Sequence, residues 1–327
     1  MDMELRGVAH GNSRYVAVGS YPNDPADPAK GRTSVALTSG DGMSFVLGKT
    51  DGINGFQGSL NDVAFGNGLF ATVGAGGSIQ TSTDGQVWVS RYTNPTEVFN
   101  GVTYGGGRFV AVGNIGLFAQ STDGITWTAS NSGSNSSYYG VTYANGQYVA
   151  AGVSGGGSSI GTSPDGITWT EVDAGGNRLL SVVYGNGAYV AVDYDGTVAR
   201  SVNSTTWSIV PSFTSNDLNH VTFGNGQFVA VAFGGLIYTS PDGTVWTERD
   251  ASTDGFSLNG ITHGNGLFVA VGQGALVMTS PNDGGQPPVT GFICHHGRHA
   301  GELQCYFGGS ASAYLQSPVQ RTKRSAH

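Results

Sequence analysis

The sequence predicts an all-β fold, a seven-bladed β-propeller with four antiparallel strands in each blade and an irregular carboxy-terminal extension. Three observations support this prediction. The chain of 327 residues repeats one pattern seven times, apolar and polar residues alternate with a period of two inside each repeat, and Gly or Asn-Gly interrupts the alternation,. The composition agrees, because 55 residues are Gly and only 11% are charged, which suits short strands joined by tight turns better than helices,.

Seven related segments begin the repeats. They start near residues 6, 61, 100, 139, 180, 219 and 259, and from residue 61 onward the starts lie 39 to 41 residues apart. The first interval is longer because Ser20–Arg32, a stretch rich in Pro and Asp, interrupts the first repeat as a loop insertion,. A unit of about 40 residues cannot bury both faces of its own sheet, so we expect the units to stack face to face in a closed circle.

Within a unit, turns divide the chain into four short strands. In the third unit the runs GVTY, RFVAVG, LFAQS and ITWT are separated by the turns GGG, NIG and TDG. Gly and Asn adopt the positive φ angles that tight hairpin turns require. Each unit is therefore expected to form a four-stranded antiparallel sheet, and the seven sheets together occupy residues 1–293.

The turn between the third and fourth strands carries the motif Ser-x-Asp-Gly-x-x-Trp. We interpret it as structural, because the Asp carboxylate can accept backbone N–H groups, Gly takes the left-handed position and Trp packs between neighbouring sheets. Degenerate copies place Phe45 at the Trp position of the first unit and Asn203 at the Asp position of the fifth. The complete copies contain Asp84 and Trp88, Asp123 and Trp127, Asp165 and Trp169, and Asp242 and Trp246.

This motif resembles the Asp-box, or BNR, repeat of the sialidase-like propeller superfamily, which includes propellers similar to photosystem II assembly factors. The resemblance extends from about Gly7 to Gly284, although the usual motif has one more residue between Ser and Trp. It implies a propeller whose boxes lie away from the active site. Sialidases also use three arginines, a Tyr–Glu pair and an Asp, but this chain has only five Glu and no three equivalently placed Arg. Sialidase activity is therefore not implied.

Function is expected at the end of the propeller that carries variable loops. The first-to-second and third-to-fourth turns are short and repetitive, whereas the second-to-third turns and the connections between blades vary, and variable loops on a rigid scaffold commonly form binding surfaces. Innermost strands start at this end, so their first residues should surround the mouth of the central channel. Amide groups beside aromatic faces suit sugar hydroxyls. The candidate ligand-binding residues are Asn61, Asp62, Asn100, Asn219, His220, Asn259, Tyr92, Tyr139, Asp193, Tyr194 and Asp195.

A structural interpretation competes with the functional one for these residues. Asn often satisfies backbone groups at strand ends, and we favour that role for the four asparagines. Asp193 and Asp195 form a close acidic pair that could bind a cation or act as acid and base, but an Asp-Gly turn explains them without catalysis. No GxSxG, HExxH or Walker A motif is present,. We assign no catalytic residue, metal site or cofactor.

Charge and hydropathy restrict the partners. The net charge is −8, and the 14 Lys and Arg form no basic stripe before the last few residues, so we expect no nucleic-acid partner,. No apolar run of 18 residues and no amino-terminal signal peptide is present, so we expect no membrane insertion,. A glycan or protein ligand is the remaining expectation, and the sequence does not predict the oligomeric state.

The carboxy-terminal region departs from the repeat. The seventh unit lacks a fourth strand with Trp, and we expect residues 288–294 to supply it, which removes an exposed sheet edge,. The extension, residues 294–327, contains Cys294 and Cys305 around three His, and from Ser310 it reads as a flexible tail,. We favour a disulfide over a Cys/His metal site, because zinc sites generally use closer ligand pairs. A disulfide indicates an extracellular or cell-surface protein.

Two functional classes follow from these observations. The first is a non-catalytic recognition or scaffold propeller that binds glycans or a protein partner at its loop-rich end. The second is a polysaccharide-acting hydrolase or lyase of the sialidase-like type, which requires one blade to carry acidic and basic groups that the others lack. The low Glu content and the even repetition favour the first class.

Overall fold

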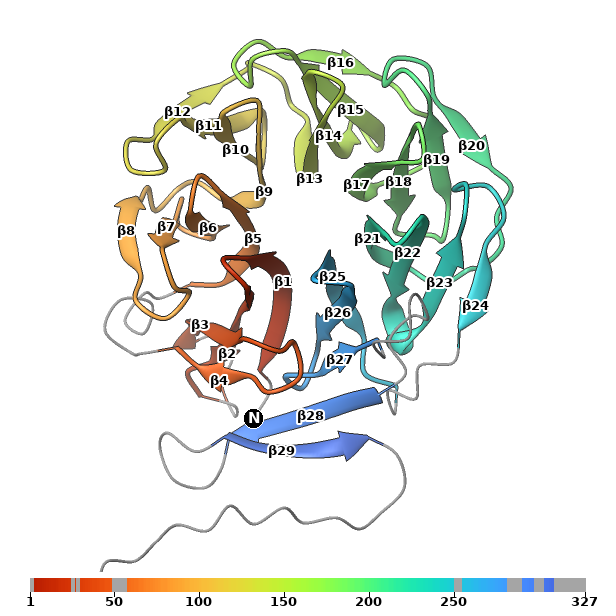
Figure 1. Ribbon diagram of the computed structural model, residues 1–327. Helices are drawn as coiled ribbons and strands as arrows, with labels where there is room; N and C mark the ends of the chain where they lie inside the picture. The colour runs from red at the N-terminus through yellow and green to blue at the C-terminus, as the bar shows by residue number, and fades with distance from the viewer. Residues whose placement is uncertain are drawn as a thin grey trace, which may run out of the picture.

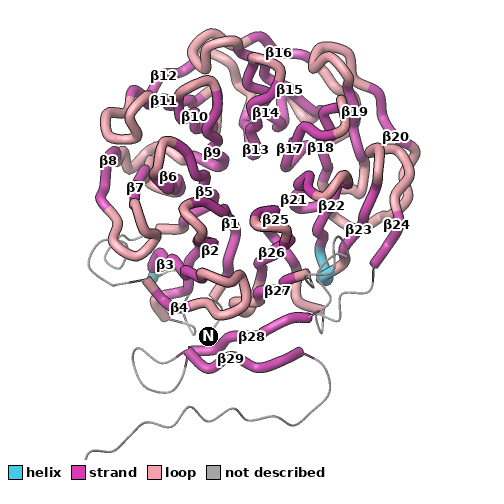
Figure 2. Tube along the Cα trace, viewed as in Figure 1, coloured by secondary structure: helices cyan, strands magenta, loops and turns pink. Residues whose placement is uncertain are grey.

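The computed structural model is a ring of seven antiparallel sheets around a central axis, which confirms the predicted fold class (Figure 1). The structure describes residues 3–24, 27, 30–48, 58–249, 255–280, 290–296 and 303–308, the last two ranges by their backbone alone. Strands make up every described blade, and blade 6 also contains a short helical turn, η2 (Phe233–Gly235) (Figure 2).

Each sheet runs from an innermost strand at the axis to an outer strand at the rim. Blade 1 contains β1 (Glu4–Gly11), β2 (Arg14–Pro22), β3 (Arg32–Ser39) and β4 (Val46–Leu47). Blade 2 contains β5 (Leu60–Gly66), β6 (Leu69–Gly74), β7 (Ile79–Ser82) and β8 (Val89–Tyr92). Blade 3 contains β9 (Phe99–Gly105), β10 (Arg108–Gly113), β11 (Leu117–Ser121) and β12 (Thr128–Asn131).

The remaining four blades follow the same order. Blade 4 contains β13 (Ser137–Ala144), β14 (Gln147–Ser154), β15 (Gly157–Ser163) and β16 (Thr170–Val172). Blade 5 contains β17 (Leu179–Gly185), β18 (Ala188–Asp193), β19 (Val198–Ser201) and β20 (Ser208–Val210). Blade 6 contains β21 (Leu218–Gly224), β22 (Gln227–Ala232), β23 (Ile237–Ser240) and β24 (Thr247–Arg249), and blade 7 contains β25 (Leu258–Gly264), β26 (Leu267–Gly272), β27 (Val277–Thr279), β28 (Thr290–His296) and β29 (Leu303–Gly308).

The ring closes where blade 1 meets blade 7. Each innermost strand contacts the next, and β25 contacts β1. Within the described residues, blade 1 consists of amino-terminal strands and blade 7 of carboxy-terminal strands, so no strand is exchanged across this junction. The N–H group of Ala275 instead donates to the carbonyl of Met3 at 3.0 Å. The closure therefore depends on contacts between blades rather than on a shared sheet.

The carboxy-terminal strands complete blade 7. Strand β28 pairs with β27 and supplies the fourth strand that the sequence assigned to residues 288–294. Strand β29 then pairs with β28 as a fifth strand, in a region expected to be irregular. It gives the outer edge of β28 a backbone partner, which the sequence prediction did not foresee because the pairing has no repeat to follow.

The hydrophobic core is divided among the seven junctions between blades. Each of seven buried clusters contains residues from two neighbouring blades, as where Phe109 of blade 3 packs with Ala71 and Val73 of blade 2. A single blade exposes both faces of its sheet, and its neighbours cover them. This distribution is the physical reason for the repeat.

Aromatic residues near the end of each innermost strand pack against a small residue of the preceding blade. A β carbon added to Gly105 would lie 2.3 Å from Cγ of Tyr143, and one added to Gly264 would lie 2.3 Å from Cγ of His10 across the ring closure. In blade 4 the equivalent small residue is Ala144, which packs near Tyr184. Small residues at this position therefore let the blades approach closely.

The Asp-Gly motif forms a compact turn in each copy. In blade 3, Oδ1 of Asp123 accepts the N–H groups of Ile125 and Thr126, both at 2.8 Å, and these bonds lower the pKa of Asp123 to about 2. Nε1 of Trp127 donates to the carbonyl of Gly124 at 3.2 Å. The same carboxylate or amide contacts occur at Asp41, Asp84, Asp165, Asn203 and Asp242.

The tryptophans of these turns lie between sheets or beside them. Trp88, Trp127 and Trp246 are buried, and Trp169 of blade 4 stacks on Phe118 of blade 3 with ring centroids 4.2 Å apart. These turns and the first-to-second turns form one end of the propeller, which we call the turn end. The second-to-third turns and the connections between blades form the opposite end, which we call the loop-rich end.

Candidate functional site

A β-bulge interrupts the pairing of the first and second strands in all seven blades. In blade 2, Leu60 pairs with Gly74 and Asp62 pairs with Val73, so Asn61 is left out of the ladder. A bulge leaves its extra residue unpaired and re-aims the side chain. The seven bulge residues, which we call the mouth ring, are Arg6, Asn61, Asn100, Tyr139, Leu180, Asn219 and Asn259.

The mouth ring lines a cavity of about 780 Å³ at the centre of the propeller. All seven innermost strands contribute to its wall. The residues that follow the ring along the strands include Asp62, Ser181 and His220, and aliphatic residues such as Val8 and Val102 come next. The channel is therefore polar near the loop-rich end and more apolar beyond it.

The asparagines of the mouth ring connect each blade to the next. Their Nδ2 atoms donate to the backbone carbonyl of the residue that precedes the next ring position. This contact, which we call the amide latch, gives the asparagines the backbone-bonding role that the structural interpretation expected,. The four latches join Asn61 to Phe99 at 2.9 Å, Asn100 to Tyr138 at 2.9 Å, Asn219 to Leu258 at 2.8 Å and Asn259 to Leu5 at 2.9 Å.

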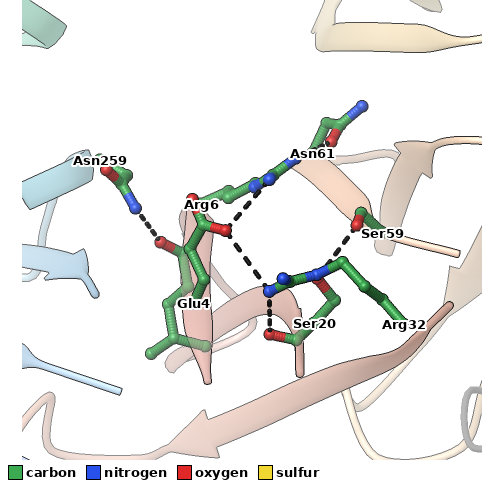
Figure 3. Close-up of polar contacts among 8 residues, drawn as sticks. Glu4, Arg6, Ser20, Arg32, Ser59, Asn61 and Asn259 are labelled. Atoms are coloured by element: carbon green, nitrogen blue, oxygen red, sulfur yellow. Dashed lines mark hydrogen bonds and ion pairs between the residues drawn. The ribbon is translucent and has the colours of Figure 1, made fainter. Parts of the chain in front are cut away.

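Blade 1 carries a charged cluster at the mouth that the sequence analysis missed (Figure 3). Arg6 donates to Oδ1 of Asn61 at 2.9 Å and to Oε2 of Glu4 at 3.1 Å. Arg32, from the end of the loop insertion, donates to the same Glu4 oxygen at 3.4 Å and to Oγ of Ser20 at 2.7 Å. Blade 1 carries Arg6 at the position where four other blades carry Asn, and this difference in sequence was the available signal for the cluster.

Asp62 lies inside the channel and contacts backbone groups of two blades. Oδ1 accepts the N–H of Val63 at 2.8 Å, and Oδ2 accepts the N–H of Val102 in blade 3 at 2.9 Å. Burial raises the pKa of Asp62 to about 7, and the two hydrogen bonds offset part of that increase,. Near neutral pH the carboxyl is therefore divided between its charged and neutral forms.

His220 lies on β21, on the other side of the channel from β5 and Asp62 (Figure 1). Burial lowers the pKa of His220 to about 4, so the imidazole is neutral at pH 7,. Its Nδ1 atom is buried and has no hydrogen-bond partner among the described residues. The structure thus brings Asp62, His220 and the four asparagines to one cavity, as the sequence predicted, without a hydrogen bond between Asp62 and His220.

Tyr139 occupies the ring position of blade 4, and Arg178 covers it. The Arg178 guanidinium donates to the Tyr139 hydroxyl at 2.6 Å, and its carbon lies 4.5 Å from the centroid of the ring. This geometry combines a hydrogen bond with a cation–π contact. Arg178 was not among the predicted ligand-binding residues, and it comes from the variable connection before blade 5.

Asp193, Tyr194 and Asp195 form a turn outside the cavity. Asp193 is fully buried and accepts the N–H groups of Asn177 at 2.8 Å and Asp195 at 3.1 Å. The Asp195 carboxylate is exposed and accepts a hydrogen bond from the Asn177 side chain. The Asp193 carboxylate is therefore engaged by the turn, and neither acid lines the channel.

Tyr92 lies at the rim rather than at the mouth. It belongs to β8, the outermost strand of blade 2, and its hydroxyl donates to Oε2 of Glu97 at 2.9 Å. Tyr92 also lines a second cavity of about 450 Å³ beside Asn114 and Asn131 of blade 3. A hydrogen bond of 2.8 Å from Asn100 to Asn114 links the two cavities, but it does not bring Tyr92 to the mouth ring.

Three large apolar side chains project from second-to-third turns at the loop-rich end. Ile115 in blade 3 is 61% exposed, Tyr194 in blade 5 is 49% exposed and Phe233 in blade 6 is 58% exposed. Of these, the sequence analysis selected Tyr194 alone. An apolar residue beside glycine in a turn was the signal that could have identified Ile115 and Phe233.

The backbone register places Cys294 directly opposite Cys305 in the β28–β29 pair. Cross-strand positions are compatible with the predicted disulfide, and the bond itself stays a prediction. Among the residues that the structure describes, no group of three or more His, Cys, Asp or Glu is arranged to hold a metal ion. In the same part of the chain, no helix has the length and apolar character needed to cross a membrane.

Solved structures similar to this chain are β-propellers. YCF48 bound to D1 peptide superposes with a TM-score of 0.63 at 18% identity, over 83% of this chain and 89% of that chain. YCF48 from Cyanidioschyzon merolae superposes with a TM-score of 0.60 at 17% identity, over 84% of this chain and 94% of that chain. A streptogramin B lyase superposes with a TM-score of 0.59 at 13% identity, over 72% of this chain and 89% of that chain. No family model and no curated protein matches the sequence. At these identities the similarity shows a shared propeller fold.

Proposed function

We propose that this protein is a non-catalytic recognition propeller that binds a segment of a partner protein at its loop-rich end, across the mouth ring. The observation that carries this proposal is the combination of a polar channel mouth with three exposed apolar side chains at the same end. Interfaces combine apolar anchors with a polar surround, and variable turns on a rigid scaffold supply both.

A protein segment fits this surface better than a glycan does. Ile115, Tyr194 and Phe233 project from three different blades, so a ligand that contacts all of them must present several apolar side chains. Glycans offer mainly hydroxyl groups and the apolar faces of single rings. The solved structure of YCF48 bound to D1 peptide supports the choice, since that propeller also accommodates a peptide.

The acidic residues support binding rather than catalysis. Asp62 and Asp193 each accept two backbone N–H groups, which orders the surrounding strands and turns. A glycosidase requires two carboxyl groups facing one bond; the second carboxyl group in the cavity of Asp62 is that of Glu4, which is paired with Arg6 and Arg32, and Asp193 does not line this cavity,. The streptogramin B lyase has the same fold, so the fold alone does not separate binding propellers from catalytic ones.

Selection from a displayed peptide library, followed by binding measurements on variants, tests the proposed site. We expect Tyr194→Ala and Phe233→Ala each to weaken binding of a selected segment by about tenfold or more, as for apolar anchors in other interfaces. The matched controls are Ile125→Ala and Ile167→Ala, which remove side chains of similar exposure at the turn end. Equal affinity for all four variants would place the site elsewhere.

A glycan array and polysaccharide substrates complete the test. Saturable glycan binding in the absence of any selected peptide would favour the lectin-like alternative. Product release that Asp62→Asn abolishes would favour the hydrolase or lyase alternative.

We also propose that the chain is an Asp-box propeller that is exported from the cell. The turn contacts at Asp123 and its equivalents support the first statement. The cross-strand positions of Cys294 and Cys305 support the second, because structural disulfides belong to oxidising compartments,. Fractionation of cells that make the protein, followed by immunodetection, tests the location.

A further inference from the structure

We propose that the mouth ring recognises an alkylammonium group of the bound segment, either a lysine side chain or a free amino terminus. The ammonium group lies against Asp62 and the amide oxygens of the ring, and its carbon chain lies against Leu180. The inference rests on the proposed recognition function and names the chemical group that the channel mouth selects.

The hydrogen-bond donors of the mouth are used in part within the protein. The Nδ2 atoms of Asn61, Asn100, Asn219 and Asn259 donate to backbone carbonyls of the next blade. Arg6 donates to Glu4 and to Asn61. Among the described residues, Asn100 uses both of its amide N–H groups, whereas Asn61, Asn219 and Asn259 each keep one and Arg6 keeps its other guanidinium N–H groups,.

The acceptors of the mouth include a carboxylate and several amide oxygens. Among the described residues, no donor contacts the Oδ1 atoms of Asn100, Asn219 and Asn259, although each of these residues lines the cavity. Asp62 accepts one N–H at each carboxylate oxygen, and each oxygen retains a further lone pair,. The neutral His220 imidazole also lines the cavity, and its buried Nδ1 has no hydrogen-bond partner in the described structure. Such a set of acceptors suits a group that carries several donors.

An ammonium group matches this set better than other donors do. It presents three N–H donors on one atom and carries a positive charge, so one group can bond to a carboxylate and to neighbouring amide oxygens together. A hydroxyl offers a single donor. A guanidinium is planar and suits paired oxygens on a single plane rather than acceptors around a ring.

The apolar part of the ring faces Asp62 across the channel. Leu180 is the ring residue of β17, which lies across the channel from β5 in Figure 1. An alkyl stem that lies against Leu180 directs its charged end toward blade 2. The ring therefore supplies an apolar side for methylene groups and a polar side for the ammonium group.

The charges around the mouth also favour a cation. The cations of blade 1, Arg6 and Arg32, share the Glu4 carboxylate, which reduces their repulsion of a positive ligand, whereas Arg178 on Tyr139 adds a positive charge on another side of the ring. At the loop-rich end of blades 5 and 6, the Asp193 and Asp195 charges act on Asp217, so three acids lie near one another. With a net charge of −8 for the whole chain, the field attracts cationic groups,.

Titration of paired small probes, followed by NMR of isotopically labelled protein, tests this inference without a known partner. The first pair is n-butylammonium and n-butanol, which have the same alkyl chain and differ in charge and donor number. We expect the ammonium probe to bind at least about tenfold more tightly, with shifts at the His220 imidazole and the ring amides. Equal affinities, or no shift with either probe, would overturn the inference.

Two further pairs distinguish the sources of the ammonium group. Nα-acetyl-lysine methylamide represents a lysine side chain and alanine methylamide represents an amino terminus, and each is compared with its fully acetylated form. Asp62→Asn should reduce the affinity for the preferred amine by at least about fivefold, whereas Asp123→Asn at the turn end should leave it within about twofold. Unchanged affinity in a folded Asp62→Asn protein would contradict the assigned contact.

The selected segments separate this inference from the proposed function. If chemical acetylation of every amine leaves the affinity of a selected segment within about twofold, the ammonium inference is wrong and the recognition function stands. If acetylation weakens binding about tenfold while Tyr194→Ala and Phe233→Ala have no effect, the ammonium inference stands and the proposed apolar anchors are wrong.

Discussion

Asp62→Asn is the substitution whose effect on stability should depend most strongly on pH. Burial in the channel raises the pKa of Asp62 from an ordinary value of 3.8 to about 7. A carboxyl group with a higher pKa in the folded state holds its proton more tightly there than in the unfolded state. The protonated form of Asp62 therefore stabilises the fold at low pH, and this contribution is lost as the pH rises from about 4 through about 7,.

The magnitude follows from the size of this difference. A change of about three pKa units corresponds to about 4 kcal/mol, because each unit corresponds to about 1.4 kcal/mol. Asp62 keeps some contact with water in the channel, so we expect about 1–3 kcal/mol,. Asn is neutral at every pH, but its single oxygen can accept only one of the two N–H groups that Asp62 accepts, which costs stability equally at every pH,. The stability of the variant relative to the wild type should therefore rise by about 1–3 kcal/mol between about pH 5 and about pH 8.

His220 makes the comparison between variant and wild type necessary. Its pKa of about 4 lies below the ordinary 6.5, so the neutral folded form is favoured above about pH 6.5 and loses its advantage as the pH falls through about 4,. This dependence opposes that of Asp62 in the wild type, and the difference between the two proteins isolates Asp62. Urea unfolding followed by Trp fluorescence at several pH values measures it, with His220→Gln as the control of opposite sign. A difference that stays constant from about pH 5 to about pH 8 would refute the reasoning.

Three further predictions concern the parts of the fold that hold the site. Gly105→Ala should destabilise the protein by about 1–3 kcal/mol in thermal unfolding, since the added β carbon meets Tyr143,. The control Ala144→Gly, at the equivalent position of blade 4, should change stability by less than about 1 kcal/mol. Equal effects of the two substitutions would contradict the packing argument. Asp123→Ala should lower the urea midpoint through the loss of two accepted N–H bonds, while Asp123→Asn should be nearly neutral because Asn203 makes the same contacts in blade 5,. Alkylation without reductant should leave both cysteines unmodified in mass spectrometry, and addition of two alkyl groups would show that the predicted disulfide is absent.

The fold was predictable because its information is local and repeated. Alternating residues define each strand, glycine marks each turn, and seven copies of the pattern fix the number of blades,. Even the last strand of blade 7 could be placed at residues 288–294, since one unit lacked its fourth strand. Strand β29 could not be anticipated, because its pairing follows no repeat.

The contents of the site were predictable only in part. Chain direction places the first residues of the innermost strands at the loop-rich end, which identified the asparagines, Asp62 and His220 as neighbours. It does not give distance from the axis, so Tyr92 on an outermost strand was grouped with residues of the channel. The bulge at each ring position depends on the register between two strands, which a repeat alignment does not reveal.

The amide latch removes the opposition between the structural and functional interpretations of the asparagines. An amide has a donor side and an acceptor side, and the latch uses the donor side to join neighbouring blades. The acceptor side is then left at the same point of every blade that carries the latch, except where Arg6 bonds to Asn61. Three ring positions have no latch, and they are occupied by Arg6, Tyr139 and Leu180.

Blades without a latch still pack through their buried clusters, so those three ring positions are the ones where side chains can change most readily without opening the ring. They provide the mouth with a charged group and an apolar side, whereas the asparagines provide similar acceptors around the rest of the circle. Specificity for one ligand orientation must therefore come from the ring residues that differ from the repeated Asn, namely Arg6, Tyr139 and Leu180. The repeat itself supplies the rigid frame that holds those residues at fixed positions.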